Sequence, residues 1–297
     1  SEQTISLSGI SDGGETDQTI TISAAADSSS FFSSGPTVTY TSNDTTGTLA
    51  YTVAGDVNGT STVTITVQDD GGTDNSGLDT VTTTFDVTVT AVNDAPTISN
   101  LDGITSPFTE DGGAITIVSG TSNTVSVADV DSDEFSTGTL TLGLSFPDNS
   151  TLAVATSGSF SITSGSPNIL TYDHDSDTGT DDVTVATFPN FEKNTDWVFT
   201  LKSGSTPTAI GDLLNAITYN NSSEDPNTTD RILTVALVDG DGTDNDGAET
   251  SDTSTVTISI TSVNDVPTIS GLDGESLTVT QGDSATVIDS SSASSVA

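Results

Sequence analysis

AVNDAPTIS, residues 91–99, recurs almost unchanged as SVNDVPTIS at residues 262–270. Each copy follows an alternating apolar and polar run, places Asn-Asp shortly before a proline, and starts a new apolar segment. An acidic, glycine-rich loop precedes each copy. Repetition on this scale is typical of tandem modules that contact mainly their neighbours. The repeat predicts a module at 1–94, a larger one at 95–265, and the truncated start of a further repeat at 266–297.

The segments between the joints alternate with a period of two residues. The clearest examples are TVTITV (62–67), FDVTV (85–89) and VTISI (256–260). Threonine on one face and Val or Ile on the other describes a half-buried antiparallel strand with a solvated outer face. Turn clusters such as SDGG (11–14) separate these runs. The pattern therefore predicts an all-β fold of tandem antiparallel β-sandwich modules.

The second module is long for one simple sandwich, which predicts insertions. Residues 168–201 carry the patterns of extra strands. Residues 209–217 place apolar side chains at 210, 213, 214 and 217, which is the spacing of a short helix. Trp197 is expected to anchor the core of this module.

The charge of the chain limits its partners. The formal net charge is -40, and Lys193, Lys202 and Arg231 are the only Lys and Arg residues among 297. Nucleic acid is excluded as a partner because phosphate binding needs a stripe of Lys and Arg. The sequence also has no Cys and no apolar run of roughly 20 residues, so neither disulfides nor direct membrane insertion is expected.

The motifs resemble the cadherin-like and immunoglobulin-like repeats of giant secreted bacterial adhesins. One repeat type is suggested by LSGISDGG (7–14) and by residues 67–94, and another by ADVDSD (128–133) and ITYNN (217–221). The resemblance implies an extracellular or cell-surface rod that acts as a stalk or spacer for adhesion. Its partners would be neighbouring modules of the same long chain, and its joints would bind calcium.

Calcium prefers six to eight oxygen ligands, which several converging acidic loops can supply. For the first joint the expected donors are Asp69 and Asp70 of the late loop, Asn93 and Asp94 of the linker, and Glu110, Asp111, Asp129, Asp131 and Asp133 of the next module. By resemblance to cadherin-like joints, Asn93, Asp94, Asp129 and Asp131 are the best candidates.

For the second joint, Asn264 and Asp265 match the first linker, while Asp239 and Asp241 occupy the late-loop position. Gln281 stands where Glu110 does, which predicts an incomplete second joint. The alternative is that these Asp residues only form turns and carry solvated charge.

Other patterns point to weaker alternatives. Residues 129–133 and 173–177 mimic the start of an EF-hand loop but lack its glycine at position six. His174 is the only His, so an acid–base or triad site is not expected and the chain is predicted not to be an enzyme. A second function stays open: a subunit of a filament, sheath, surface layer or viral fibre that contacts lateral or end-to-end copies of itself. A carbohydrate-binding or carbohydrate-active module is a remote third.

Overall fold

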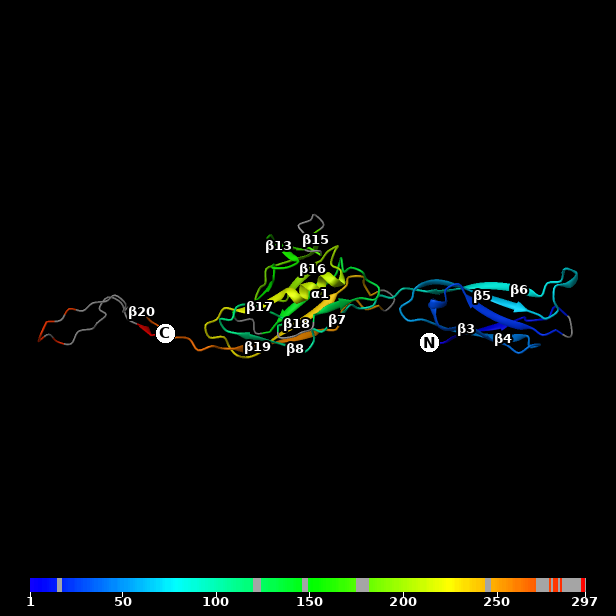
Figure 1. Ribbon diagram of the computed structural model, residues 1–297, viewed down its shortest axis with the longest axis horizontal. Helices are drawn as coiled ribbons and strands as arrows, with labels where there is room; N and C mark the ends of the chain where they lie inside the picture. Colours follow the sequence, from blue (N-terminus) through cyan, green and yellow to red (C-terminus); the bar gives the residue numbers. More distant parts are fainter. Residues whose placement is uncertain are drawn as a thin grey trace. The chain divides into compact units, whose positions relative to one another are not determined.

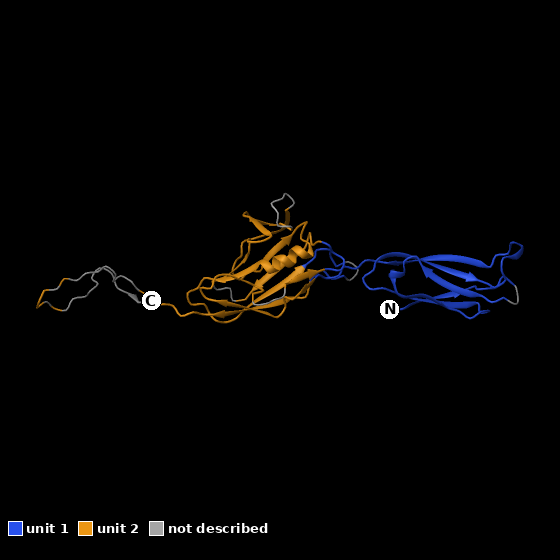
Figure 2. Ribbon diagram, viewed as in Figure 1, with its two compact units in different colours: residues 1–96, 129–133, 238–250 blue, residues 97–128, 134–237, 251–297 orange. Residues whose placement is uncertain are grey.

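A computed structural model describes residues 1–14, 18–119, 124–145, 149–174, 182–243, 247–270, 278, 280–282, 284 and 295–296. The chain forms two compact units (Figure 2). Unit 1 comprises Ser1–Pro96, Asp129–Asp133 and Val238–Thr250, and unit 2 comprises Thr97–Ala128, Glu134–Leu237 and Ser251–Ala297. Unit 1 thus includes two acidic loops that the sequence pattern assigned to the second module. Most of the predicted further repeat, and Asp175 and Asp177, lie outside the described residues.

Unit 1 is built on a β-sandwich. Its elements are β1 (Gln3–Ser8), β2 (Thr21–Ala26), η1 (Ser29–Phe31), β3 (Phe32–Thr39), β4 (Thr46–Val53), β5 (Gly59–Gln68), η2 (Asp74–Ser76) and β6 (Thr80–Val89). They form two antiparallel sheets, ordered β1-β4-β3 and β2-β5-β6. Phe32 of the first sheet packs with Val63 and Val87 of the second in one buried cluster. Burying the apolar face of each sheet against the other holds the sandwich together.

Unit 2 has a larger sheet and a larger core. Its elements are β7 (Thr97–Ser99), β8 (Ile104–Thr109), β9 (Ile115–Thr116), β10 (Ser126–Ala128), β11 (Thr139–Leu144), β12 (Ser150–Val154), β13 (Phe160–Thr163), β14 (Asn168–Tyr172), β15 (Val183–Phe188), β16 (Trp197–Leu201), α1 (Pro207–Ala216), β17 (Ile217–Asn221), β18 (Arg231–Val238), β19 (Ser254–Thr261), β20 (Ile269–Ser270) and β21 (Ser295–Val296). The eight-stranded sheet has the order β13-β14-β15-β16-β11-β18-β19-β8, and β12-β17-β9 and β10-β7 form smaller sheets. The predicted all-β fold with one short helix is confirmed.

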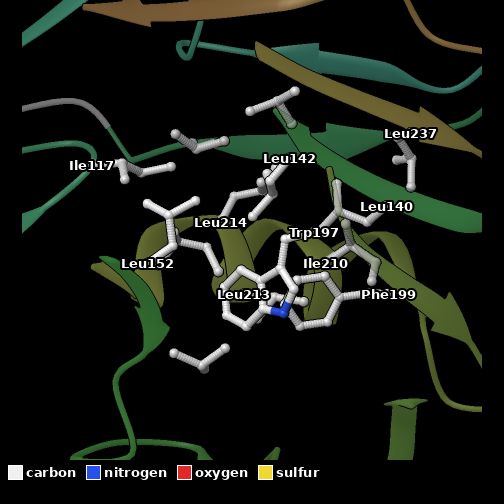
Figure 3. Packing of buried hydrophobic residues seen from close by; sticks show 14 of the residues in the cluster. Ile117, Leu140, Leu142, Leu152, Trp197, Phe199, Ile210, Leu213, Leu214 and Leu237 are labelled. Atoms are coloured by element: carbon white, nitrogen blue, oxygen red, sulfur yellow. The ribbon is translucent and has the colours of Figure 1, made fainter. Parts of the chain in front are cut away.

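Helix α1 supplies a central part of this core. The Thr206 side chain caps it by accepting a hydrogen bond from the Ala209 N–H (3.2 Å), and Pro207 fits the first turn, where no N–H partner is needed. Figure 3 shows its Ile210, Leu213 and Leu214 packed with Trp197 and with leucines of β11. Trp197 is only 3% exposed, so its predicted place in the core is confirmed. In the described part of the chain, no helix is long and apolar enough to cross a membrane.

Strand β8 departs from the predicted antiparallel pattern. It pairs in parallel with β19, with Ile104 opposite Val256 and Thr109 opposite Thr261 (Figure 1). Both strands therefore end at the same edge of unit 2, and β19 leads directly into residues 262–267. This pairing places Glu110, the residue after β8, beside the end of β19.

Candidate metal site at the first linker

Asn93 is held in a socket formed by the loop that contains Ala248. Its Nδ2 donates hydrogen bonds to Asp239 Oδ2 (3.0 Å) and to the Ala248 carbonyl (2.5 Å). The Ala248 N–H returns a hydrogen bond to the Asn93 carbonyl (2.8 Å). The same Nδ2 also donates to the Asp94 carbonyl (3.4 Å). Because all three partners are acceptors, they fix the orientation of the side-chain amide. A Cβ on Gly247 would lie 2.9 Å from Asn93 N, so only glycine leaves room for the linker there.

Asp94 connects the linker to a second acidic loop. Its N–H donates to Asp131 Oδ2 (3.3 Å). Within that loop, Asp129 Oδ1 accepts from the N–H groups of Asp131 and Ser132, both at 3.1 Å. The Ser132 hydroxyl donates to Asp241 Oδ2, which ties this loop to the one that holds Asn93. Three segments distant in sequence therefore gather carboxylates around one Asn-Asp pair.

The carboxylates of this cluster have no basic side chain in their own unit. Unit 1 contains neither Lys, Arg nor His. Asp239 is fully buried and uses its Oδ1 to accept from the Asp241 N–H (2.9 Å). Asp129 Oδ2 is buried and has no hydrogen-bond partner. Burial raises the pKa of Asp129 to about 6, and its contact with Asp131 acts in the same direction. An orphaned, desolvated carboxylate oxygen of this kind fits a bound cation.

A pocket of about 260 Å³ adjoins the linker. Its lining includes Asp56, Asn58, Asp94 and Asp131. The sequence prediction missed Asp56 and Asn58. A sequence signal for them exists, because both lie in a polar turn just before β5. The start of β5 pairs with the end of β6, which leads into the linker.

Asp69 and Asp70 do not reach the first linker, so their predicted role there is wrong. The β5–β6 ladder runs from Gly59 opposite Val89 to Gln68 opposite Thr80. Asp69 therefore lies about 30 Å of strand away from the linker end of the hairpin. Asp70 instead accepts from the Thr19 N–H (2.8 Å), a bond that lowers its pKa.

Asp239 and Asp241 are misplaced in the prediction for the same reason. They were expected at the second linker, but they surround Asn93 of the first. Strand β19 follows their loop and runs along its whole length before Asn264 is reached. A loop that precedes the last strand of a module lies at the opposite end from the linker that follows that strand.

Glu110 belongs to the second linker rather than the first. Its N–H donates to the Thr261 carbonyl (2.9 Å), and its Oε2 accepts from the Val263 N–H (2.6 Å). The side chain is 3% exposed, and its Oε1 is buried without a hydrogen-bond partner. Asp111, the next residue, is exposed, and its predicted place at the first joint stays a prediction. Asn264 and Asp265 are exposed, as is Asp133 in unit 1.

The carboxylates do not by themselves form a closed cage. Among the described residues, no group of three or more His, Cys, Asp or Glu side chains converges on one point. The first linker offers carboxylates together with the Asn93 amide and main-chain carbonyls. Calcium accepts such mixed oxygen ligands.

No protein-family model and no curated protein sequence matches the chain. Cadherin ectodomains are among the solved structures to which the chain is similar. Human protocadherin-24 EC1-2 is 14% identical over 84% of this chain and 85% of its own, with a TM-score of 0.33. Protocadherin gamma B2 extracellular cadherin domains 3-6 are 12% identical over 90% of this chain and 52% of their own, with a TM-score of 0.35. Drosophila N-cadherin EC1-4 is 16% identical over 84% and 41%, with a TM-score of 0.32. The chain thus spans about half or less of the two longer structures.

Proposed function

We propose that the chain is a calcium-stabilised spacer segment of a large extracellular surface adhesin or matrix protein, and not an enzyme. The observation that carries the proposal is the first linker, where Asn93 and Asp94 are held by acidic loops while Asp129 Oδ2 has no partner. Such an arrangement leaves negative charge uncompensated at the point where the chain passes out of a β-sandwich. A cation is the simplest group that would complete it.

The residues that would hold calcium at the first linker are Asn93, Asp94, Asp129, Asp131, Asp239 and Asp241. Asp56 lines the adjoining pocket and is a further candidate. At the second linker the candidates are Glu110, Asn264 and Asp265. Bound calcium would neutralise the clustered carboxylates and hold the linker against its acidic loops.

The energetic effect would be large beside the stability of a domain. Extracellular calcium modules bind with Kd values of about 10⁻⁴–10⁻³ M. At free calcium about 100 times Kd, one site adds roughly 2.7 kcal/mol to folding. Typical domains have about 5–15 kcal/mol in total.

A thermal melt tests the proposal. The full chain is heated at fixed ionic strength with calcium titrated against chelator, and with magnesium in parallel. We expect a saturable, calcium-specific rise in Tm that Asp131→Ala weakens and Asp133→Ala leaves intact. Asp131 accepts a hydrogen bond from the linker residue Asp94, whereas the Asp133 side chain is exposed. Identical melting curves in calcium, magnesium and chelator would show that the acidic loops carry only solvated charge and bind no specific cation. That result would reject the proposal.

A self-assembling subunit of a filament or sheath is the second candidate, and exposed apolar residues favour it. Leu78 is 88% exposed and Val266 is 83% exposed.

Trp197 gives no support to a carbohydrate-binding role, because its ring is buried in the core and cannot stack on a sugar. His174 is exposed and is the single His of the sequence, and the proposal assigns it no catalytic role.

A further inference from the structure

The first and last strands of the large sheet of unit 2 are direct neighbours (Figure 1). In the sequence, β8 is the first strand of this sheet and β19 is the last. They pair in parallel over six residue pairs, from Ile104 opposite Val256 to Thr109 opposite Thr261. Chain continues on both sides of unit 2, so a pull along the chain reaches β8 at its first residue and β19 at its last.

This geometry determines how the strand pair carries a pull. Force enters and leaves at opposite ends of the ladder, and these ends are roughly 17 Å apart at about 3.3 Å per residue. A unit under tension turns until its two points of attachment line up with the force. The two strands are then drawn past each other, so the six residue pairs share the load instead of breaking one after another.

Asp102 closes the end of the ladder where β8 begins. Its Oδ1 accepts hydrogen bonds from the Thr255 N–H (2.8 Å) and from the Thr255 hydroxyl (2.9 Å). The Gly103 N–H donates to the Thr255 carbonyl (2.9 Å). The two bonds from Thr255 lower the pKa of Asp102, so this carboxylate is charged. Hydrogen bonds to a charged acceptor are stronger than those between neutral groups.

Glu110 closes the opposite end of the ladder. Its N–H donates to the Thr261 carbonyl (2.9 Å), and its Oε2 accepts from the Val263 N–H (2.6 Å). The side chain is buried, so water has little access to compete for these bonds. Val263 lies beyond the end of β19, so this contact lengthens the ladder at the point where a pull would act.

The inner face of the strand pair is anchored in the core of unit 2. Phe108 and Ile258 are buried, and the Phe108 ring packs edge to face on Tyr219 with ring centres 5.2 Å apart. The Ser106 hydroxyl donates to the Ile117 carbonyl (2.5 Å). Strand β19 also pairs antiparallel with β18 over five residue pairs. Neither strand can therefore slide without breaking contacts on more than one side.

We infer that residues 102–110 and 255–263 form a shear clamp that keeps unit 2 folded while the chain is under tension. This inference rests on the proposed spacer function and deepens it, because a spacer transmits force only while its units stay folded. The clamp consists of contacts within unit 2, so it works without calcium. Strand β7 precedes the clamp and is held to β10 by three residue pairs, so it should give way first.

Single-molecule pulling of the full chain tests the clamp. The sequence has no Cys, so pairs of introduced cysteines define the points of attachment. Thr97→Cys with Ser262→Cys loads opposite ends of the ladder, whereas Thr97→Cys with Thr253→Cys loads the same end. All three side chains are exposed. Unfolding of unit 2 is recognised by its length gain of roughly 3.3–3.6 Å per released residue. In chelator, we expect the first pair to need a force several times that of the second.

Glu110→Ala separates load bearing from a general loss of stability. When opposite ends are loaded, the bonds of Glu110 share the force, so unfolding at constant force should become at least about tenfold faster. When the ladder opens from its other end, these bonds break last and the rate should change little. Asp102→Ala is a second variant, at an exposed side chain, and should also speed unfolding when opposite ends are loaded. Asp111→Ala, the exposed neighbour, should change neither rate.

Two results would overturn the inference: equal unfolding forces for the two pairs of attachment points, or equal acceleration by Glu110→Ala in both. The proposed function is judged separately, by the calcium-dependent rise in Tm. Asp131→Ala should weaken that rise and leave the unfolding force of unit 2 in chelator unchanged, so the failure of one idea can be told from the failure of the other.

Discussion

The side chain of Asn93 donates a 3.0 Å hydrogen bond to Asp239, which lies 146 positions later in the sequence. The same amide also binds the Ala248 carbonyl, and the Ala248 N–H binds the Asn93 carbonyl. Three hydrogen bonds thus hold the linker residue, while the surrounding carboxylates have no basic side chain in their own unit. The linker is ordered by contacts that carry negative charge with them, so we expect the stability of unit 1 to be sensitive to cations.

Replacing Asn93 with Ala should destabilise the linker socket. The change removes the side-chain hydrogen bonds to the Ala248 carbonyl and to Asp239, and it leaves the buried Asp239 carboxylate without this donor. Each lost bond costs about 1 kcal/mol, so we expect the free energy of unfolding of unit 1 to fall by about 1–3 kcal/mol. Urea unfolding measures it. Asn264→Ala is the matched control, and an equal loss in both variants would mean that the socket contributes nothing.

Asp129→Asn should have opposite effects with and without calcium. In chelator the neutral amide relieves a desolvated charge beside Asp131, so Tm should rise. In calcium the variant lacks a charged ligand, so its calcium-induced shift should be smaller than that of the natural chain. Asp133→Asn provides an exposed carboxylate for comparison. A fall in the Tm of Asp129→Asn in chelator would show that the charge of Asp129 does not destabilise the folded state without a cation.

The raised pKa of Asp129 gives a pH dependence with a definite sign. The folded pKa is about 6 and the ordinary value is 3.8, so the folded chain binds this proton more tightly than the unfolded chain does. Its favourable contribution is present below about pH 4 and is lost as pH rises through 6. Calcium must displace the same proton, so its apparent affinity should fall between pH 7 and pH 5. Calorimetric titrations at both pH values measure this change, and in Asp129→Asn the change should be smaller.

The sequence predicts local features better than it predicts which loops meet. The alternation at 62–67 and the apolar spacing at 210, 213, 214 and 217 predict β5 and α1 because each pattern reflects a nearby buried face. For Asp69 and Asp239 the sequence predicts the wrong linker, because each loop is close in sequence, but not in space, to the linker that follows it. A strand of about ten residues separates such a loop from the next linker by roughly 30 Å. The parallel pairing of β8 with β19 has no local signal, so Glu110 could not be placed from the sequence alone.

Glu110→Ala should loosen the second linker. The change leaves the Val263 N–H without its 2.6 Å acceptor, and hydrogen bonds to charged groups are worth about 1.5–3 kcal/mol. The Val263 amide should therefore exchange with solvent at least about tenfold faster. Native-state hydrogen exchange by NMR measures this rate. Asp111→Ala changes the exposed neighbour and should leave it unaltered, so equal acceleration in both variants would contradict a specific role for Glu110.

Tyr172 should make unit 2 sensitive to alkali. Its hydroxyl donates to Asp212 Oδ2, its side chain is buried, and burial, reinforced by Asp212, raises its pKa to about 12. Because the unfolded pKa is about 10, the folded state holds this proton more tightly, and that contribution disappears as pH rises from 10 to 12. Tyr172→Phe should lower stability by about 1 kcal/mol at pH 8 and flatten the loss of stability at higher pH. Urea unfolding from pH 8 to pH 11 tests both effects. Tyr40→Phe, which removes an exposed hydroxyl, should keep the slope of the natural chain, and a slope unchanged in Tyr172→Phe would show that another group titrates in this range.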